Sequence, residues 1–415
     1  MLSLKQVFVS SSTYTADVSG VCSALFELGG MTVIHDPSGC NSTYNTHDEP
    51  RWYGQDSLVF ISGLSQMDAL MGNDEKLIRD IERAAIDLKP SFISLVRTPV
   101  PLMTGMDFEA IAGEIEARTG IKTLYFPTTG MLSYVRGAGM ALEAVARHLI
   151  EPRDSCRDAG KKSAGGRRPG VNVLGVTPLD FSVGTTVDSI RTWLEDQGFH
   201  VQSVFAMGSS IDEIRTAGQA DLNLVVSSVG FPAARELERR FGTPYVIGCP
   251  VADYGEILKM SMLNTIHGRE QGRDWRSINL SACDMIKQRN KHQNHDAYRE
   301  MFREPCYLIG EPVTGLSIAG AIYLRTGVLP VVLSPLETDQ EIISVYCRPL
   351  RGEEEIRRSV KDAKTLIADP MYREICPEGA EFISLPHEAY SGRIYRSRIP
   401  DLVRIFETWP ERIGR

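Results

Sequence analysis

Short runs rich in β-branched residues alternate with longer amphipathic stretches along most of this 415-residue chain. This alternation is typical of parallel sheets whose strands are connected by helices. In the first third of the chain, the apolar runs predict strands at 31–34, 57–61, 92–96 and 123–126. The amphipathic stretches beside them predict helices at 18–28, 74–87, 107–118 and 133–149. Residues 1–150 are therefore expected to form a small doubly wound domain.

The same alternation returns twice farther along the chain. Strands are predicted at 171–176, 201–205, 222–226 and 245–247, with helices at 185–197, 210–217 and 232–241. A last block predicts strands at 307–309, 329–333, 365–368 and 382–385, with helices at 314–326 and 353–363. We therefore expect an α/β protein of three doubly wound, Rossmann-like parallel-sheet domains, at 1–150, 171–299 and 300–415.

Two polar segments separate these blocks. Residues 151–170 are rich in glycine and basic side chains, which predicts a linker. Residues 267–299 interrupt the alternation and are expected to form a polar crossover between the middle and C-terminal domains. Since doubly wound sheets bind ligands at the carboxyl ends of their strands, the loops at those ends are the first places to look for function.

Composition narrows the choice of partners. The chain has 45 basic and 53 acidic side chains and a net charge of −8. Because nucleic-acid-binding proteins usually carry a basic face, no nucleic-acid partner is expected. The longest apolar tract, 316–333, contains Arg325 and Pro330 and does not fit a membrane span. With no signal-peptide pattern and no Cys-x-x-Cys pair among eight cysteines, we expect a cytoplasmic protein without a membrane partner or a disulfide framework.

The densest candidate for chemistry follows the first predicted strand, in the segment His35-Asp36-Pro37-Ser38-Gly39-Cys40. Proline and glycine allow a sharp turn there, which would expose the thiol of Cys40. A thiolate on such a loop suits iron or zinc, although a buried, inert cysteine fits the same residues. Two further loops, at 97–107 and 127–130, also follow predicted strands of this block. We expect the three loops to meet at one edge of the first sheet.

This segment resembles the His-Gly-Pro-x-Gly-Cys loop of nitrogenase component 1 subunits and their relatives. Residues 71–77, 89–109 and 126–130 resemble further segments of that family, in the same order. Phe241-Gly242-Thr243-Pro244 and Gly310-Glu311-Pro312 continue the resemblance into the later blocks. The chain is therefore identified as similar to nitrogenase component 1 subunits, which implies three doubly wound domains and a first domain that binds a cluster.

Departures from the family pattern indicate the kind of subunit. One cluster-binding cysteine of the family falls on Pro99, which offers no ligand, and another falls near residue 16. Cys22 is the second candidate metal ligand, but its place inside a predicted helix also fits a core residue. No cysteine at 222–228 matches the one that anchors the large cofactor of α-type subunits. The resemblance therefore implies a β-type subunit, in which Cys40 and Gly39 help bind an iron–sulfur cluster of 4Fe-4S or P-cluster type at a subunit interface.

The resemblance also implies a function for that cluster. It would relay electrons from an ATP-dependent iron protein to a reductive site in a homologous α-type partner. This chain has no Gly-x-x-x-x-Gly-Lys-Ser/Thr loop, so ATP hydrolysis would belong to the separate iron protein. A four-iron cluster usually takes four protein ligands, which favours a heterotetramer in which the partner supplies the others.

The sequence is compatible with several kinds of nitrogenase-like protein. The β-type subunit of methylthio-alkane reductases fits best; the alternatives are a subunit of a nitrogenase-cofactor assembly scaffold and a tetrapyrrole-reducing homodimer. A periplasmic-type binding protein would carry a signal peptide, which disfavours that class. His387, at the end of a predicted strand, fits either a substrate contact or a hydrogen-bonded structural residue.

Overall fold

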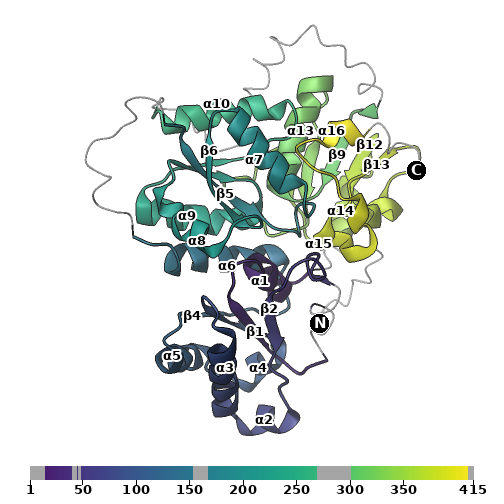
Figure 1. Cartoon of the computed structure of the whole chain (residues 1–415). Coiled ribbons are helices and arrows are strands. Elements are labelled where there is room, and N and C mark those ends of the chain that lie inside the picture. The colour runs from purple at the N-terminus through teal and green to yellow at the C-terminus, as the bar shows by residue number, and fades with distance from the viewer. Residues whose placement is uncertain (1–14, 40–43, 45–47, 153–166, 269–300, 410–415) are drawn as a thin grey trace.

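The computed structural model describes residues 15–39, 44, 48–152, 167–268 and 301–409. Within these ranges the strands form three sheets, and neighbouring strands of each sheet run parallel (Figure 1). The first sheet lies lowest in the figure, and the other two lie above it. The predicted α/β architecture of three parallel-sheet domains is thereby confirmed.

The first sheet is covered by helices on both faces. Its strands, in spatial order, are β2 (Leu58–Ile61), β1 (Met31–His35), β3 (Ile93–Arg97) and β4 (Thr123–Phe126). Every residue of β1 is buried, as expected for a central strand of a parallel sheet. One face packs against α3 (Asp74–Leu88) and α5 (Phe108–Thr119), and the other against α1 (Asp17–Leu25) and α6 (Tyr134–His148). The short helices α2 (Gln66–Met71) and α4 (Pro99–Thr104) follow β2 and β3.

The second and third sheets repeat this plan. The second has the order β6 (His200–Ala206), β5 (Gly170–Val176), β7 (Leu222–Val225), β8 (Tyr245–Ile247), with helices α7 (Thr186–Asp196), α8 (Ile211–Arg215), α9 (Phe231–Phe241) and α10 (Tyr254–Ile266). The third has the order β11 (Cys347–Pro349), β10 (Val331–Ser334), β9 (Cys306–Ile309), β12 (Thr365–Ala368), β13 (Glu381–Ser384), with helices α13 (Pro312–Thr326), α14 (Glu353–Ser359), α15 (Glu388–Ser391) and α16 (Ile405–Thr408). Short 3-10 helices lie at Ala217–Gln219, Ser228–Gly230, Pro370–Ile375, Gly392–Ile394 and Arg396–Arg398.

The helix pair α1 and α6 joins the first sheet to the other two. A Cβ atom added at Gly20 of α1 would lie 2.4 Å from the carbonyl oxygen of Tyr134. One added at Gly137 of α6 would lie 1.9 Å from the carbonyl oxygen of Asp17. Both positions require glycine, because a side chain at either would push the helices apart. On its far side α6 packs against α9 of the second sheet.

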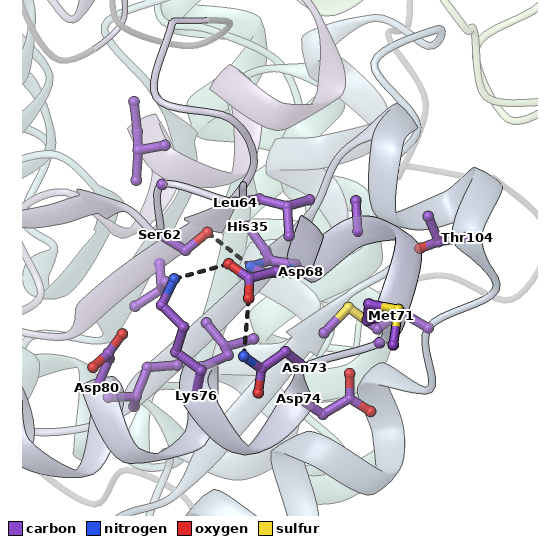
Figure 2. A pocket seen from close by; sticks show the side chains of 18 of the residues that line it. His35, Ser62, Leu64, Asp68, Met71, Asn73, Asp74, Lys76, Asp80 and Thr104 are labelled. Carbon is purple, nitrogen blue, oxygen red and sulfur yellow. Dashed lines mark hydrogen bonds and ion pairs between the residues drawn. The ribbon is translucent and has the colours of Figure 1, made fainter. Parts of the chain in front are cut away.

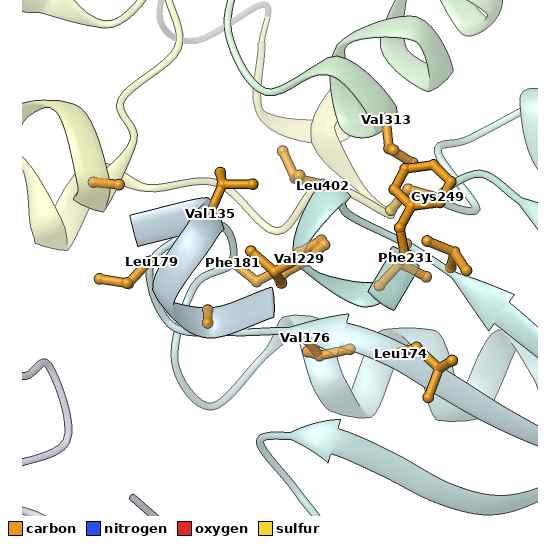
Figure 3. Close-up of a cluster of buried hydrophobic side chains, with 14 of the residues drawn as sticks. Val135, Leu174, Val176, Leu179, Phe181, Val229, Phe231, Cys249, Val313 and Leu402 are labelled. Carbon is orange, nitrogen blue, oxygen red and sulfur yellow. The ribbon is translucent and has the colours of Figure 1, made fainter. Parts of the chain in front are cut away.

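A continuous apolar core results from this arrangement. It runs from α1 and α6 through the second sheet to the third. Figure 3 shows part of it, with Val135 of α6, Val229 and Phe231 beside the second sheet, and Leu402 among the side chains drawn. A separate apolar cluster fills the space between the first sheet and helices α3 and α5. Among the described residues, the continuous core therefore reaches the first sheet on the face that carries α1 and α6.

The structure departs from the sequence expectations mainly at short elements. The helix expected at 210–217 stops at Arg215 and continues as a 3-10 turn, and the helix expected to reach 363 ends at Ser359. Helices α2, α4, α10, α15 and α16 and strand β11 were not expected. Most of the linker 151–170 and of the crossover 267–299 lies outside the described residues, so the domain boundaries stay a prediction. No described helix has the length and apolar character needed to cross a membrane.

Candidate functional site

The loops that follow β1, β3 and β4 meet at one edge of the first sheet, as the sequence predicts. The hydroxyl of Thr98 lies 2.8 Å from the carbonyl oxygen of His35 and 2.6 Å from Oδ1 of Asp36. Nε of Arg97 donates to the carbonyl of Thr128 at 3.2 Å, and the hydroxyl of Thr128 donates back to the carbonyl of Arg97. These hydrogen bonds hold the three loops together as one surface, which we call the loop edge.

Asp17 ties the β4 loop to helix α1. Its side chain is fully buried, and Oδ1 accepts from the backbone N–H groups of Val18 at 2.9 Å and Gly130 at 2.8 Å. Its Oδ2 accepts from the N–H of Thr129 at 2.8 Å. Hydrogen bonds to a charged acceptor are stronger than those between neutral groups, so this carboxylate fixes the loop. Asp17 was not among the residues expected at the site; the available signal was an acidic residue at the start of a predicted helix.

The predicted cluster loop leaves the loop edge toward solvent. Asp36 is buried, whereas Ser38 and Gly39 are exposed. A Cβ atom added at Gly39 would meet no described atom within 4 Å, so crowding by described residues does not explain the glycine. Cys40 lies outside the described residues, and its position at this edge stays a prediction.

The chain returns from the cluster loop onto helix α1 through a buried ion-pair network. Nε of Arg51 donates to Glu49 at 2.6 Å, and its Nη atoms donate to Glu27 at 2.9 Å and to the carbonyl of Ser23 at 2.7 Å. The hydroxyl of Tyr44 donates to Glu49 at 3.1 Å. Burial opposes the charge of Arg51, but the two carboxylates outweigh it and raise the pKa of the guanidinium. The far end of the cluster loop is thus anchored on α1.

Cys22, the second predicted metal ligand, lies inside α1 with its side chain fully buried in the core. Burial raises the pKa of its thiol well above the ordinary value, which disfavours the thiolate that a metal requires. The other described cysteines belong to the second and third sheets or follow their strands, away from the loop edge: Cys249, Cys306, Cys347 and Cys376. In the described ranges no group of three or more His, Cys, Asp or Glu side chains could hold a metal ion. The described residues alone therefore do not fit an iron–sulfur cluster, and Cys40, Cys156 and Cys283 lie outside them.

His387 lies at the junction of the three sheets, directly after β13, among buried polar groups. Its Nε2 is 3.5 Å from Oδ1 of Asp180, and the hydroxyl of Tyr134 donates to the same oxygen. Its backbone N–H donates to Asp369 at 2.8 Å, and its ring lies edge-on to Tyr390 with centroids 4.7 Å apart. These contacts give the histidine a defined place in the packed interior.

The junction leaves little free space. Glu311, which precedes α13, is buried there and accepts the backbone N–H groups of Ser228 at 2.8 Å and Thr314 at 2.7 Å. Burial raises the pKa of its carboxyl group. The cavity beside Glu311 and His387 has a volume of about 20 Å³, which is enough for about one water molecule. Among the described residues, the space beside Glu311 and His387 is therefore almost filled by side chains.

Comparisons with known proteins bear on this geometry. The family model "Nitrogenase component 1 type Oxidoreductase" matches residues 19–252, more than half of the chain. The chain belongs to this family. The family resemblance inferred from the segment His35 to Cys40 is thereby confirmed, and the matched range includes the whole described part of the loop edge.

Curated relatives of this nitrogenase component 1 type chain include members with different roles. The nitrogenase iron-molybdenum cofactor biosynthesis protein NifE of Clostridium pasteurianum is 25% identical over 310 residues, which cover 70% of this chain and 63% of the relative. A subunit of the light-independent protochlorophyllide reductase of Zygnema circumcarinatum is 27% identical over 187 residues, 44% of this chain and 36% of the relative. The chain thus spans less than two thirds of the length of either relative.

A solved structure supports the fold of this family member over its full length. The chain of "Nitrogenase Cp1 at pH 6.5" matches with a TM-score of 0.68 and 14% identity, covering 100% of this chain and 94% of that one. At this identity the likeness establishes the three-sheet architecture alone. The family itself rests on the sequence match to residues 19–252.

Proposed function

We propose that this chain is a β-type subunit of a nitrogenase-like reductase. In this proposal Cys40, with Gly39 beside it, helps bind an iron–sulfur cluster at the interface with a homologous α-type subunit. The cluster passes electrons from an ATP-dependent iron protein to a reductive site in that partner, with methylthio-alkanes as the preferred substrate class. Two findings support the proposal: the chain belongs to an oxidoreductase family, and the loops after β1, β3 and β4 meet at one loop edge.

One observation carries the proposal: among the described residues the space beside Glu311 and His387 is small, whereas the end of the loop edge is exposed. The junction of the three sheets holds a cavity of about 20 Å³, far below the ~300–1,000 Å³ of typical small-molecule sites. The loop edge instead ends in exposed Ser38 and Gly39, next to Cys40. This contrast supports a chain that contributes to an interface site and does not house substrate at its own centre.

Apolar side chains next to the loop edge support a partner subunit there. Helix α4 and the β4 loop adjoin, since Pro99 would lie 3.3 Å from a Cβ atom at Gly130. Met103 on α4 is 86% exposed, and Met131 in the loop is 84% exposed. Exposed apolar patches mark protein interaction sites, so these two methionines on adjoining segments support a partner surface here.

The native mass and iron content of the purified complex test this proposal. The chain is produced with an α-type partner and, separately, alone. We expect a two-fold complex of two chains of each kind that holds iron and acid-labile sulfide, and little iron on the chain alone. A monomer with its own cluster, or a homodimer with full iron content, would contradict the proposal.

The match to NifE over 70% of this chain supports a second candidate, a subunit of a cofactor-assembly scaffold. A scaffold would load a cofactor onto an apo-reductase, whereas a reductase would turn over substrate when supplied with the iron protein and ATP. The match to a protochlorophyllide reductase supports a tetrapyrrole-reducing assembly as a third candidate. That assembly would show tetrapyrrole reduction and, in its homodimeric form, two identical chains.

A further inference from the structure

A cavity of about 620 Å³ opens in the first domain, on the side of the sheet away from the sheet junction (Figure 2). Its floor is the outer face of β1 and β2, and its walls are helices α2 and α3 and the residues that end α4. Its volume lies within the range of small-molecule sites. It is separate from the crevice that the family fold forms between the three sheets, and nothing in the proposed function uses it.

The cavity exists because α2 packs loosely. This six-residue helix has no buried residue, and its Leu70 and Met71 are 73% and 76% exposed although they line the cavity. The neighbouring α3 buries Ile78 and Ile81 against the sheet and leaves the end of β2 without a close cover. Phe60 on that strand is therefore 40% exposed, and the apolar floor remains open to a molecule from solvent.

The floor also carries an unsatisfied polar atom. His35 is 4% exposed, and its Nδ1 is hydrogen-bonded to the hydroxyl of Ser62 at 2.7 Å. Its Nε2 is buried and has no hydrogen-bond partner among the described residues. A buried polar atom without a partner is unfavourable by about 1–3 kcal/mol, so the imidazole gains if it turns this atom toward a polar group of a bound molecule.

Charges at the rim restrict the ligand. Four aspartates line the cavity against one lysine: Asp68, Asp74, Asp80, Asp107 and Lys76. The lysine is already paired, because its Nζ lies 2.8 Å from Oδ2 of Asp68 (Figure 2). The remaining rim is negative, which repels phosphates and carboxylates and tolerates neutral or positively charged groups.

We propose that this cavity binds an uncharged or cationic amphipathic organic molecule. Its apolar body lies on Val33, Phe60 and Met106, and a polar group of the molecule lies against the imidazole of His35. A positively charged group, where the molecule has one, lies at the rim beside Asp80, toward one end of the cavity in Figure 2.

The probes that test this site are two dyes of similar shape and different charge. The full chain is titrated with the neutral dye N-phenylnaphthylamine and with the anionic dye anilinonaphthalene sulfonate. We expect saturable binding of the neutral dye at one site per chain, and at least about tenfold weaker binding of the anionic dye. Absence of saturable neutral-dye binding, or equal affinities for the two dyes, would overturn the proposal.

Two cavity-filling variants locate the site. Ala69→Phe lies on α2, whose residues are all unburied, and Ala84→Phe lies on the cavity wall formed by α3. Either variant is expected to weaken binding of the neutral dye by about tenfold or more. Ala110→Phe is the matched control, because this residue is exposed on α5 and does not line the cavity. Unchanged binding in folded Ala69→Phe, or an equal loss in the control, would show that the dye binds elsewhere.

Discussion

Replacing Asp17 tests how the loop edge is held in place. Asp17→Ala leaves three backbone N–H groups, those of Val18, Thr129 and Gly130, without their acceptor. An unsatisfied buried donor is unfavourable by about 1–3 kcal/mol. Thr129 and Gly130 are only half-buried, so water can satisfy part of the loss. We therefore expect the free energy of unfolding to fall by about 3–4 kcal/mol.

Asp17→Asn, with Asp107→Asn as its control, distinguishes the loss of the hydrogen-bond acceptor from the loss of the negative charge. In Asp17→Asn one oxygen still serves Val18 and Gly130, while the amide nitrogen faces the N–H of Thr129, so the expected loss is about 1–2 kcal/mol. Asp107→Asn is the control. Asp107 caps α5 by accepting the N–H of Ala110 at 3.0 Å, and asparagine caps a helix about as well as aspartate. Its expected change is below about 0.5 kcal/mol.

Urea unfolding followed by far-ultraviolet circular dichroism measures these differences, and amide hydrogen exchange locates them. The N–H groups of Thr129 and Gly130 should exchange faster in Asp17→Ala than in the wild type. If Asp17→Ala unfolded at the wild-type urea concentration and both amides exchanged at the wild-type rate, the carboxylate would not be holding the loop.

Three further predictions use the same unfolding measurement. Arg51→Ala leaves Glu49 buried without its cation and should lower the free energy of unfolding by about 3–5 kcal/mol. The control is Arg79→Ala, which should change it by less than about 0.5 kcal/mol, because the Arg79 side chain is 65% exposed. Similar losses in both variants would refute the ion-pair network. Burial lowers the pKa of His35 from 6.5 to about 4, so between these values the unfolded chain binds a proton that the folded chain does not, and stability falls as the pH drops. His35→Asn lacks this titration, so from pH 7 to pH 4.5 its free energy of unfolding should fall by about 2 kcal/mol less than that of the wild type. Equal decreases in both proteins would contradict the lowered pKa of His35. Gly137→Ala should push α1 and α6 apart and lower the free energy of unfolding by about 3 kcal/mol or more. Gly113→Ala, on the exposed side of α5, should raise it by about 0.5–1 kcal/mol. An unchanged stability in Gly137→Ala would exclude the close approach of α1 and α6.

The three sheets follow from the sequence because burial leaves a clear record in the pattern of apolar positions. Strand β1 is buried along its whole length and contains the β-branched run Thr32-Val33-Ile34, which marks it in the sequence as a strand. Helices α2 and α4 leave no such record, because a six-residue helix completes fewer than two turns. Gly20 and Gly137 weaken the helical pattern locally, and only the structure shows that they allow α1 and α6 to approach.

The candidate site is predictable where local sequence decides it and unpredictable where distant residues meet. The alternation of strands and helices places three loops at one edge, since parallel strands end on the same side of a sheet. The bond between Asp17 and Gly130 joins residues 113 positions apart, and nothing in the sequence pattern pairs them. The cavity beside His35 was not expected either, because it results from the loose packing of α2 and not from any motif.

The most direct test of the central claim is the iron content and the electron paramagnetic resonance spectrum of the complex that carries Cys40→Ala. The variant and the wild type are purified with the α-type partner, together with Cys376→Ala as a control at a half-buried cysteine directly after the 3-10 turn Pro370–Ile375. We predict that Cys40→Ala lowers bound iron and abolishes the reduced-cluster signal while the complex stays folded, and that Cys376→Ala retains both. Unchanged iron and an unchanged signal in folded Cys40→Ala would contradict the account.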